Sequence, residues 1–353
     1  MARTAGQPLL CAPMTTAYDT RRPRLQLITD SIPTRPQETP PRRRIIVRAN
    51  FSLPGEDDVM RGIADYTFND WRRLRPLTHI LKTIRYLVVD WNHMRRPARA
   101  GDGESLRTAI RGKSLLVTIA FADPQVIEWQ ARLVRRYVPQ ALYIVADNSP
   151  DDASAAAIEA VALRLDVPYV RLPKNPWQPP SRSHGIALNW MWRNVIRPGE
   201  PAAFGFIDDD LFPTAPDDPF ALLSIQDFYG VVRPAGSRWF LWAGFCFYRF
   251  DRVKHLPLDF GQDWFNGLDT GGGNWRMIYR KIERASVREA ETVFVPFEPG
   301  IEVADGPLQW CGSWLHEVGL MGREDLAPRK RQVVAGILDK HLTGSEPVPP
   351  RTV

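Results

Sequence analysis

Ala202-Ala203-Phe204-Gly205-Phe206-Ile207-Asp208-Asp209-Asp210-Leu211-Phe212-Pro213 is an apolar stretch that breaks into three consecutive aspartates and closes with a proline. Its first half is typical of a strand buried on both faces. Three like charges at a strand terminus repel one another, and a bound cation offsets that repulsion. Mg²⁺ and Mn²⁺ prefer oxygen ligands and often bridge protein carboxylates to substrate phosphates. The stretch therefore predicts a site for a metal and a diphosphate, with a solvated acidic turn as the alternative.

Strands and helices alternate upstream of the aspartates. The apolar run 114–121 predicts a buried strand, and Asp123-Pro124 then begins a helix, with Asp at the N-cap and Pro in the first turn. Further strands are expected at 141–146 and 168–172, and further helices at about 151–165 and 185–195. Alternation at this spacing predicts right-handed crossovers and a Rossmann-type α/β fold, with a mostly parallel sheet flanked by helices.

Two of the predicted strands end in polar acidic clusters. Asp147-Asn148-Ser149-Pro150-Asp151-Asp152 follows the second strand, and Asp208 to Asp210 follow the fourth. In parallel sheets, ligands bind at the carboxyl ends of the strands. We therefore expect both clusters to lie at one edge of the sheet and to form a ligand site.

The order of these elements resembles the nucleotide-sugar glycosyltransferases of the GT-A fold, over residues 114–320. The resemblance implies an inverting hexosyltransferase that uses a nucleotide-sugar donor of the UDP-glucose type and a Mn²⁺ or Mg²⁺ ion. The sequence contains no Gly-rich dinucleotide fingerprint and no Walker loop, which argues against dehydrogenases and P-loop enzymes.

The resemblance also implies roles for individual residues. Asp208 and Asp210 match the family's Asp-x-Asp metal motif, and His316, in a late Trp-x-His setting, matches the histidine that completes the metal shell. A lone histidine is more often a packing or surface residue, which is the alternative for His316. The donor-binding residues implied are Asp147, Asn148, Asp152, Arg182, Asn189 and Asp209.

The downstream half is expected to supply the acceptor site and the catalytic base. Trp239 and Trp242 lie in a dense aromatic run and suit a stacking surface, with core packing as the alternative. An inverting transferase needs a carboxylate that takes the proton of the acceptor hydroxyl. Asp269, which precedes three glycines, is our first choice and Asp263 the second; an Asp-capped turn is the alternative. The acceptor contacts expected around this base are Gly271, Gly272 and Asn274.

The acceptor itself is less clearly indicated. The stretch 268–274 and the aromatic run before it are similar to glucosyltransferases of the base J type and their phage relatives, which act on hydroxymethylated pyrimidines. A net charge of +6 suits a DNA backbone, and chemistry on a duplex base requires base flipping. The alternatives are an envelope polysaccharide or other glycan acceptor, a non-catalytic nucleic-acid-binding module on a degenerate transferase fold, and a nucleotidyltransferase.

Four segments are expected along the chain. Residues 1–44 are rich in Pro and Arg and predict a disordered or extended basic arm. Residues 45–113, with a strand at 45–51, predict a helical extension and linker that pack on the main domain. Residues 114–325 form the catalytic domain, and 326–353 a C-terminal tail. The helix of the extension is predicted from apolar residues at helical spacing, Leu77, Ile80, Leu81, Ile84 and Leu87.

Bulk composition is that of a globular protein, with 44% hydrophobic and 24% charged residues. No apolar run is long enough for a membrane span. The three cysteines are widely separated and lack metal-ligand spacing, which suggests a reducing compartment. We therefore expect a cytoplasmic protein of a bacterial or phage-infected cell, with DNA as its acceptor partner.

Overall fold

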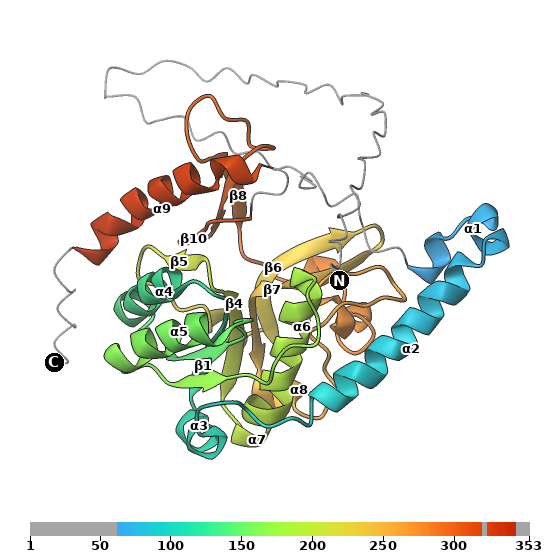
Figure 1. Cartoon of the computed structure of the whole chain (residues 1–353), viewed down its shortest axis with the longest axis horizontal. Coiled ribbons are helices and arrows are strands. Elements are labelled where there is room, and N and C mark those ends of the chain that lie inside the picture. Colours follow the sequence, from blue (N-terminus) through green and yellow to red (C-terminus); the bar gives the residue numbers. More distant parts are fainter. Residues whose placement is uncertain (1–61, 320–322, 344–353) are drawn as a thin grey trace, which may run out of the picture. The chain divides into compact units, whose positions relative to one another are not determined.

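The computed structural model describes residues 62–319 and 323–343 (Figure 1). The predicted basic arm, the strand at 45–51 and Cys11 lie outside the described residues. No helix within these two ranges is long and apolar enough to cross a membrane.

A six-stranded sheet is built from described residues in the order β3-β2-β1-β4-β7-β6. The first four of these strands run parallel to one another, and β7 and β6 form an antiparallel pair at the edge beside β4. The mostly parallel sheet predicted from the alternation of elements is therefore confirmed. Its strands are β1 (Ser114–Ala120), β2 (Leu142–Asp147), β3 (Tyr169–Arg171), β4 (Ala203–Asp208), β6 (Phe228–Ala235) and β7 (Arg238–Arg249).

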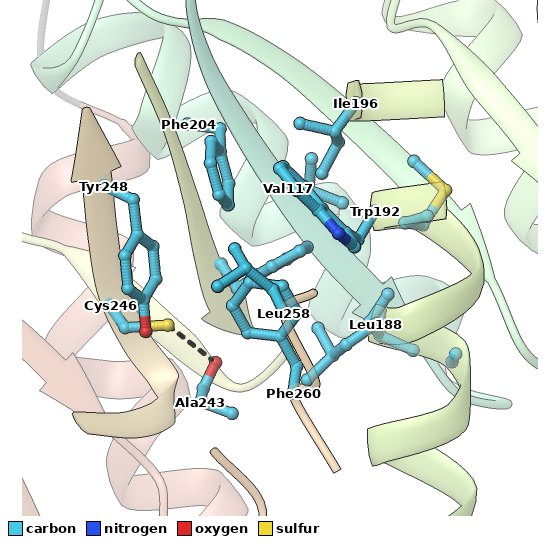
Figure 2. Packing of buried hydrophobic residues seen from close by; sticks show 14 of the residues in the cluster. Val117, Leu188, Trp192, Ile196, Phe204, Ala243, Cys246, Tyr248, Leu258 and Phe260 are labelled. Carbon is cyan, nitrogen blue, oxygen red and sulfur yellow. Dashed lines mark hydrogen bonds between the residues drawn. The ribbon is translucent and has the colours of Figure 1, made fainter. Parts of the chain in front are cut away.

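Helices cover both faces of this sheet. Successive side chains of β1 point to opposite sides, and both sets are apolar, so each face needs a covering layer. Leu115, Val117 and Ile119 pack in one buried cluster, whereas Leu116 and Ala120 pack in another. Figure 2 shows Val117 in the first cluster with Trp192, Phe204 and Phe260. The first face is covered by α3 (Gly103–Ile110), α6 (Pro180–Met191), the π-helical turn Trp192–Ile196 and α7 (Arg197–Gly199); the second by α4 (Pro124–Tyr137) and α5 (Asp152–Arg164).

The helix starts follow the capping chemistry of the sequence. Asp123 accepts hydrogen bonds from the amides of Gln125 and Val126 at the start of α4, as predicted, and Asp151 caps α5 in the same way. Short elements complete the main chain path: α8 (Phe250–Val253) and 3₁₀ turns at Ile63–Asp65, Ala221–Ser224, Gly272–Asn274, Tyr279–Lys281, Arg284–Ser286 and Glu324–Leu326.

A second, antiparallel sheet carries the end of the chain back to the first. Its order is β5 (Leu211–Pro213), β10 (Trp314–His316), β9 (Pro307–Cys311) and β8 (Thr292–Pro296). The helix α9 (Ala327–Leu342) buries Val334 and Leu338 in the same cluster as α4. The segment expected as a C-terminal tail therefore contains a helix that belongs to the core.

The N-terminal extension contains α1 (Phe68–Arg72) and α2 (Arg75–His93), which confirms the predicted helix. Its orientation differs from the expectation for an apolar face that packs on a domain. The buried side chains of α2 include His79, Thr83 and His93, whereas Leu81 and Ile84 are 67% and 52% exposed. The polar side of α2 contacts the domain, where Asp90 accepts hydrogen bonds from Trp177 and Arg182.

Candidate metal centre

Asp208, Asp210 and His316 form a cluster at the carboxyl end of β4. Each offers one ligand atom, and these atoms all lie within 4.8 Å of one another. His316 Nε2 is 3.1 Å from Asp210 Oδ1. The three side chains are only partly or barely accessible to solvent. Two carboxylates and an imidazole at this separation form a donor set for a divalent transition metal ion.

The two sheets bring this cluster together. The last residue of β4 is Asp208, and β5 begins directly after Asp210. Strand β10 pairs with β5 so that His316 stands opposite Leu211, and the amide of Glu317 donates to the carbonyl of Asp210. Residues more than a hundred positions apart in sequence are therefore fixed side by side by one antiparallel ladder.

A buried glutamine of α4 holds the turn between β4 and β5. Gln130 Nε2 donates to the carbonyls of Asp208 and Leu211, both at 2.7 Å, and its Oε1 accepts from the hydroxyl of Tyr143. Gln130 is fully buried, so its amide replaces water for carbonyls that would otherwise lack partners. The acidic turn is thus anchored from beneath.

The imidazole of His316 is oriented by a second side chain. Its Nδ1 lies 3.0 Å from Gln309 Oε1, which is an acceptor, so Nδ1–H donates to Gln309 and Nε2 faces the carboxylate of Asp210. The ring of Trp242 packs against the imidazole with a centroid distance of 4.8 Å. A histidine held through its other nitrogen is the arrangement commonly found behind metal ligands.

Burial opposes the charged forms of the three carboxylates of the turn, although the charges of Arg233 and Lys330 act on Asp208 and Asp210. Burial raises the pKa of Asp208, and it raises the pKa of Asp209 well above its ordinary value, with the neighbouring carboxylates adding to the effect. Burial also opposes the ionisation of Asp210, but the charge and hydrogen bond of His316 outweigh it and lower the pKa of that carboxyl. A divalent ion would stabilise the charged form of all three.

Two further observations show that the residues fit such an ion. Asp208 Oδ1 is buried and has no hydrogen-bond partner among the described residues. Gly244 of β7 lies against the same carboxylate, and a Cβ at this position would stand 2.4 Å from Asp208 Oδ2 and 2.3 Å from Trp242. The glycine leaves the space that this carboxylate occupies, and the carboxylate keeps a free oxygen for a ligand.

The other predicted donor contacts at this edge have partners within the fold. Asp209 Oδ2 accepts from the amide of Phe121 at 2.9 Å, which ties it to the end of β1 rather than to the metal cluster. Asp147 is buried and accepts from the amide of Ser149 and the hydroxyl of Tyr169. The amide groups of Asn148 contact Ser183 and Asn175, and Asp152 pairs with Arg99 and Arg171.

Arg182 and Asn189, both on α6, are also engaged. Arg182 is buried, forms a 2.8 Å ion pair with Asp90 of α2, and stacks its guanidinium over the ring of Tyr86 at 3.6 Å. Asn189 donates to Asp259 at 2.6 Å and accepts from the amide of Phe260 at 2.7 Å. A small cavity of about 50 Å³ lies between α2, α6 and the loop around Asp259. Donor contacts from these two residues stay a prediction.

The two candidate bases differ in their surroundings. Asp263 accepts from the amides of Phe265 and Asn266, as the alternative of an Asp-capped turn requires. Asp269 is exposed, and its carboxylate accepts from the side chains of Gln262 and Thr270. Of the two, Asp269 has the carboxylate that is available to an acceptor hydroxyl.

The glycines after Asp269 serve close packing between loops. A Cβ at Gly271 would stand 2.2 Å from the carbonyl oxygen of Leu241, and one at Gly272 would stand 2.3 Å from Leu268. Gly271 also has a φ of +97°, which favours glycine. Asn274 is buried and accepts from the amide of Asp259. The need for glycine here is explained without a ligand, so acceptor contacts from these residues stay a prediction.

The two predicted stacking tryptophans lie in different environments. Trp239 is buried and its ring packs on Phe228 and Tyr279, which favours the core-packing alternative. Trp242 is half-buried and lies between His316 and the guanidinium of Arg233, which is 5.2 Å from its ring. Trp242 is therefore part of the metal cluster's wall.

Sequence reasoning missed several residues of this site. His184 Nδ1 lies 3.6 Å from Asp208 Oδ1, although the resemblance implied donor contacts only for Arg182 and Asn189 in this part of the chain. Arg233 forms no ion pair within the part of the chain that the structure describes, and its charge acts on Asp208. His184 did have a local signal, because it is a titratable residue between the predicted donor-binding residues Arg182 and Asn189. Arg233, Gln130 and Gln309 had no local signal.

No family model matches the chain, and no curated protein matches it in sequence. Among solved structures, it is similar to a mannosyltransferase of Pyrobaculum calidifontis in complex with GDP-Man and Mn²⁺, at 14% identity and a TM-score of 0.39, over 77% of this chain and 75% of that one. It is also similar to glucosyl-3-phosphoglycerate synthase of Mycobacterium tuberculosis with Mn²⁺ and UDP-glucose, at 17% identity and a TM-score of 0.38, over 70% and 84%. A third is S. aureus TarS 1–349 with UDP-GlcNAc, at 13% identity and a TM-score of 0.30, over 42% and 48%. The likeness is one of fold.

Proposed function

We propose that the chain is a metal-dependent glycosyltransferase that uses a nucleotide-sugar donor. The observation that carries the proposal is the cluster of Asp208, Asp210 and His316 at the carboxyl end of a parallel strand, where a buried oxygen of Asp208 accepts no hydrogen bond from the described residues. This edge of the sheet is where ligands bind in such folds. A binding module has no use for clustered acids that face the phosphates of its ligand.

Asp208, Asp210 and His316 would hold Mn²⁺ or Mg²⁺, which when bound supplies Lewis-acid stabilisation for the departing nucleoside diphosphate. Gln309 fixes the tautomer of His316 in which Nε2 is the ligand atom. Arg233 adds a positive charge beside Asp208 and stacks on Trp242, which suits contact with a donor phosphate. These residues bind and orient the donor rather than exchange protons with it.

Asp269 is the proposed base that takes the proton of the acceptor hydroxyl in an inverting transfer. Its exposed carboxylate, in contrast to the turn-capping carboxylate of Asp263, supports this choice. The hexose of a UDP-glucose-type donor remains part of the proposal on the resemblance of the sequence.

A hydroxymethylated pyrimidine base in DNA is the proposed acceptor, supported by the similarity of residues 268–274 to the base J type of glucosyltransferase and by the net charge of +6. The basic arginines between 21 and 44 are outside the described residues. An envelope glycan is the alternative acceptor.

The test is transfer from a panel of radiolabelled nucleotide sugars, with Mn²⁺ or Mg²⁺, to DNA that contains hydroxymethylcytosine or hydroxymethyluracil. Unmodified DNA and a bacterial glycan extract are the parallel acceptors. The Asp210→Asn variant should lose transfer and Mn²⁺ binding by calorimetry, whereas Asp251→Asn, an exposed acid of α8, should keep both.

Label that enters modified DNA and disappears with EDTA would support the enzyme class and the acceptor together. Metal-dependent hydrolysis of one donor without labelled DNA would retain the transferase and reject the DNA acceptor. If no donor is hydrolysed or transferred with either metal, the proposed activity is wrong.

A further inference from the structure

Helix α2 presents an apolar face to solvent. The residues Leu77, Leu81, Ile84, Val88 and Trp91 recur at alternating spacings of four and three, so they form one stripe along the helix. Each of these side chains is between 47% and 67% exposed. Figure 1 shows α2 as the long cyan helix.

The opposite face of α2 is fixed by polar contacts that a rotation of the helix would break. Asp90 accepts from Trp177 Nε1 at 2.7 Å and pairs with the buried Arg182 at 2.8 Å. Nearer the start of the helix, the hydroxyl of Tyr66 lies 2.9 Å from Nδ1 of the buried His79. Separation of a buried ion pair leaves an uncompensated charge. The outward direction of the apolar stripe is therefore a property of the fold.

Exposed apolar side chains are concentrated at this one place. Thirteen large hydrophobic side chains are exposed within the described ranges, and nine of them lie between residues 68 and 91. Of these nine, six lie on α2, and Phe68, Trp71 and Leu74 lie in α1 and the turn that follows it. A concentrated apolar surface on a soluble protein marks an interaction site.

The charges around the stripe indicate what covers it. Residues 62–99 contain eight basic and three acidic residues. Two of the acids, Asp70 and Asp90, already pair with Arg75 and Arg182. Exposed Lys82 and Arg85 lie on α2, and the described segment carries further arginines at both ends of the helix. A second copy of the same surface would bring like charges together, whereas an anionic surface complements them.

We propose that this face of α1 and α2 binds an anionic lipid surface, with α2 lying in the plane of the interface. An interfacial helix has an apolar face with Trp, Phe and Leu, flanked by Lys and Arg. Trp71 and Trp91 suit the headgroup region because their rings are amphipathic. Arg85, next to Ile84 on the flank of the stripe, would reach the headgroups while its methylene stem remains apolar.

This proposal does not rest on the proposed enzymatic function, since it concerns a surface on the far side of α2 from α6. Its test therefore needs no donor, metal or acceptor. The assay is co-sedimentation of the full chain with phosphatidylcholine vesicles, with and without phosphatidylglycerol, at low and high salt. Binding should require phosphatidylglycerol and should weaken as salt screens the charges.

The decisive variant is the double substitution Leu81→Glu and Ile84→Glu. The two aliphatic side chains would be buried in the lipid on binding, so their replacement should weaken vesicle binding by roughly a hundredfold. The matched control is Leu163→Glu on α5, where the leucine is 75% exposed and lies on another face. Because all three side chains are exposed, the variants should melt with the wild type. A charge reversal, Lys82→Glu with Arg85→Glu, should remove the preference for phosphatidylglycerol.

Failure of the wild-type chain to bind anionic vesicles would overturn the proposal, as would equal binding by the double variant and the Leu163→Glu control. Sedimentation velocity without lipid provides a further check. A wild-type dimer that the double variant converts to a monomer would assign the face to a second copy of the chain instead.

Discussion

The two acidic clusters at the carboxyl edge of the sheet are alike in sequence and different in structure. Both end strands that run parallel to β1, where Asp147 pairs with Ala120 and Asp208 with Ile119. In the first cluster, Asp147 and Asp152 have all their close partners within the fold. In the second, Asp208 keeps a buried oxygen that accepts no hydrogen bond from the described residues and lies 3.6 Å from His184 Nδ1. The two clusters therefore differ in how far the fold itself satisfies their carboxylates, and donor contacts from the first cluster stay a prediction.

The sharpest test of this contrast compares one substitution in each cluster. Asp208→Asn should reduce Mn²⁺ affinity and metal-dependent donor turnover by more than about a hundredfold, the upper end of what second-shell changes cause, since it removes a ligand. Asp152→Asn, in the exposed ion pair with Arg171, should leave Mn²⁺ affinity unchanged. Calorimetry with Mn²⁺ measures the affinity, and equal losses in the two variants would erase the distinction.

Gln309→Leu tests whether the orientation of His316 matters. The variant removes the acceptor that fixes Nδ1, so Mn²⁺ affinity should fall by about 10- to 100-fold. Gln309→Glu keeps an acceptor at the same distance and should restore part of the affinity. If thermal stability falls and metal affinity does not, Gln309 has only a structural role.

Tyr169→Phe tests how much the hydrogen bonds of the first cluster contribute to the stability of the fold. It removes the hydroxyl that donates to the buried carboxylate of Asp147, and the free energy of unfolding should fall by about 1–3 kcal/mol. Chemical denaturation measures the loss. Mn²⁺ affinity should stay at the wild-type value, and a parallel loss of metal binding would join the two clusters into one functional site.

The smallest effect is expected from the pH dependence of Asp152. Hydrogen bonds from Arg171 and Arg99 lower the pKa of Asp152 below its ordinary value of 3.8. A lowered folded-state pKa contributes stability that is present above the ordinary value and is lost as the pH falls below it. Asp152→Asn should therefore lower the melting temperature slightly at neutral pH and not at pH below about 3. A difference that persists in acid would contradict the ion-pair explanation.

Part of the fold could be predicted because its causes are local. The apolar runs of β1, β2 and β4 and the Asp123 cap of α4 are set by neighbours in sequence. The place of α9 in the core could not be predicted in this way. It depends on contacts with α4, such as that between Tyr137 and His341, which no local pattern reveals. The apolar spacing of α2 predicted the helix correctly and gave no information on which face would be buried.

The sequence by itself determined the alternating α/β pattern, the edge of the sheet where the candidate site lies, and Asp208 and Asp210 as the predicted centre of that site. Only the tertiary structure decided that His316 stands beside Asp210, because that contact depends on the pairing of β10 with β5. It also decided which carboxylates are satisfied within the fold and that α2 turns its apolar face outward. Periodicity and charge are local properties of a chain, whereas the partners of a buried polar atom come from segments that only folding brings together.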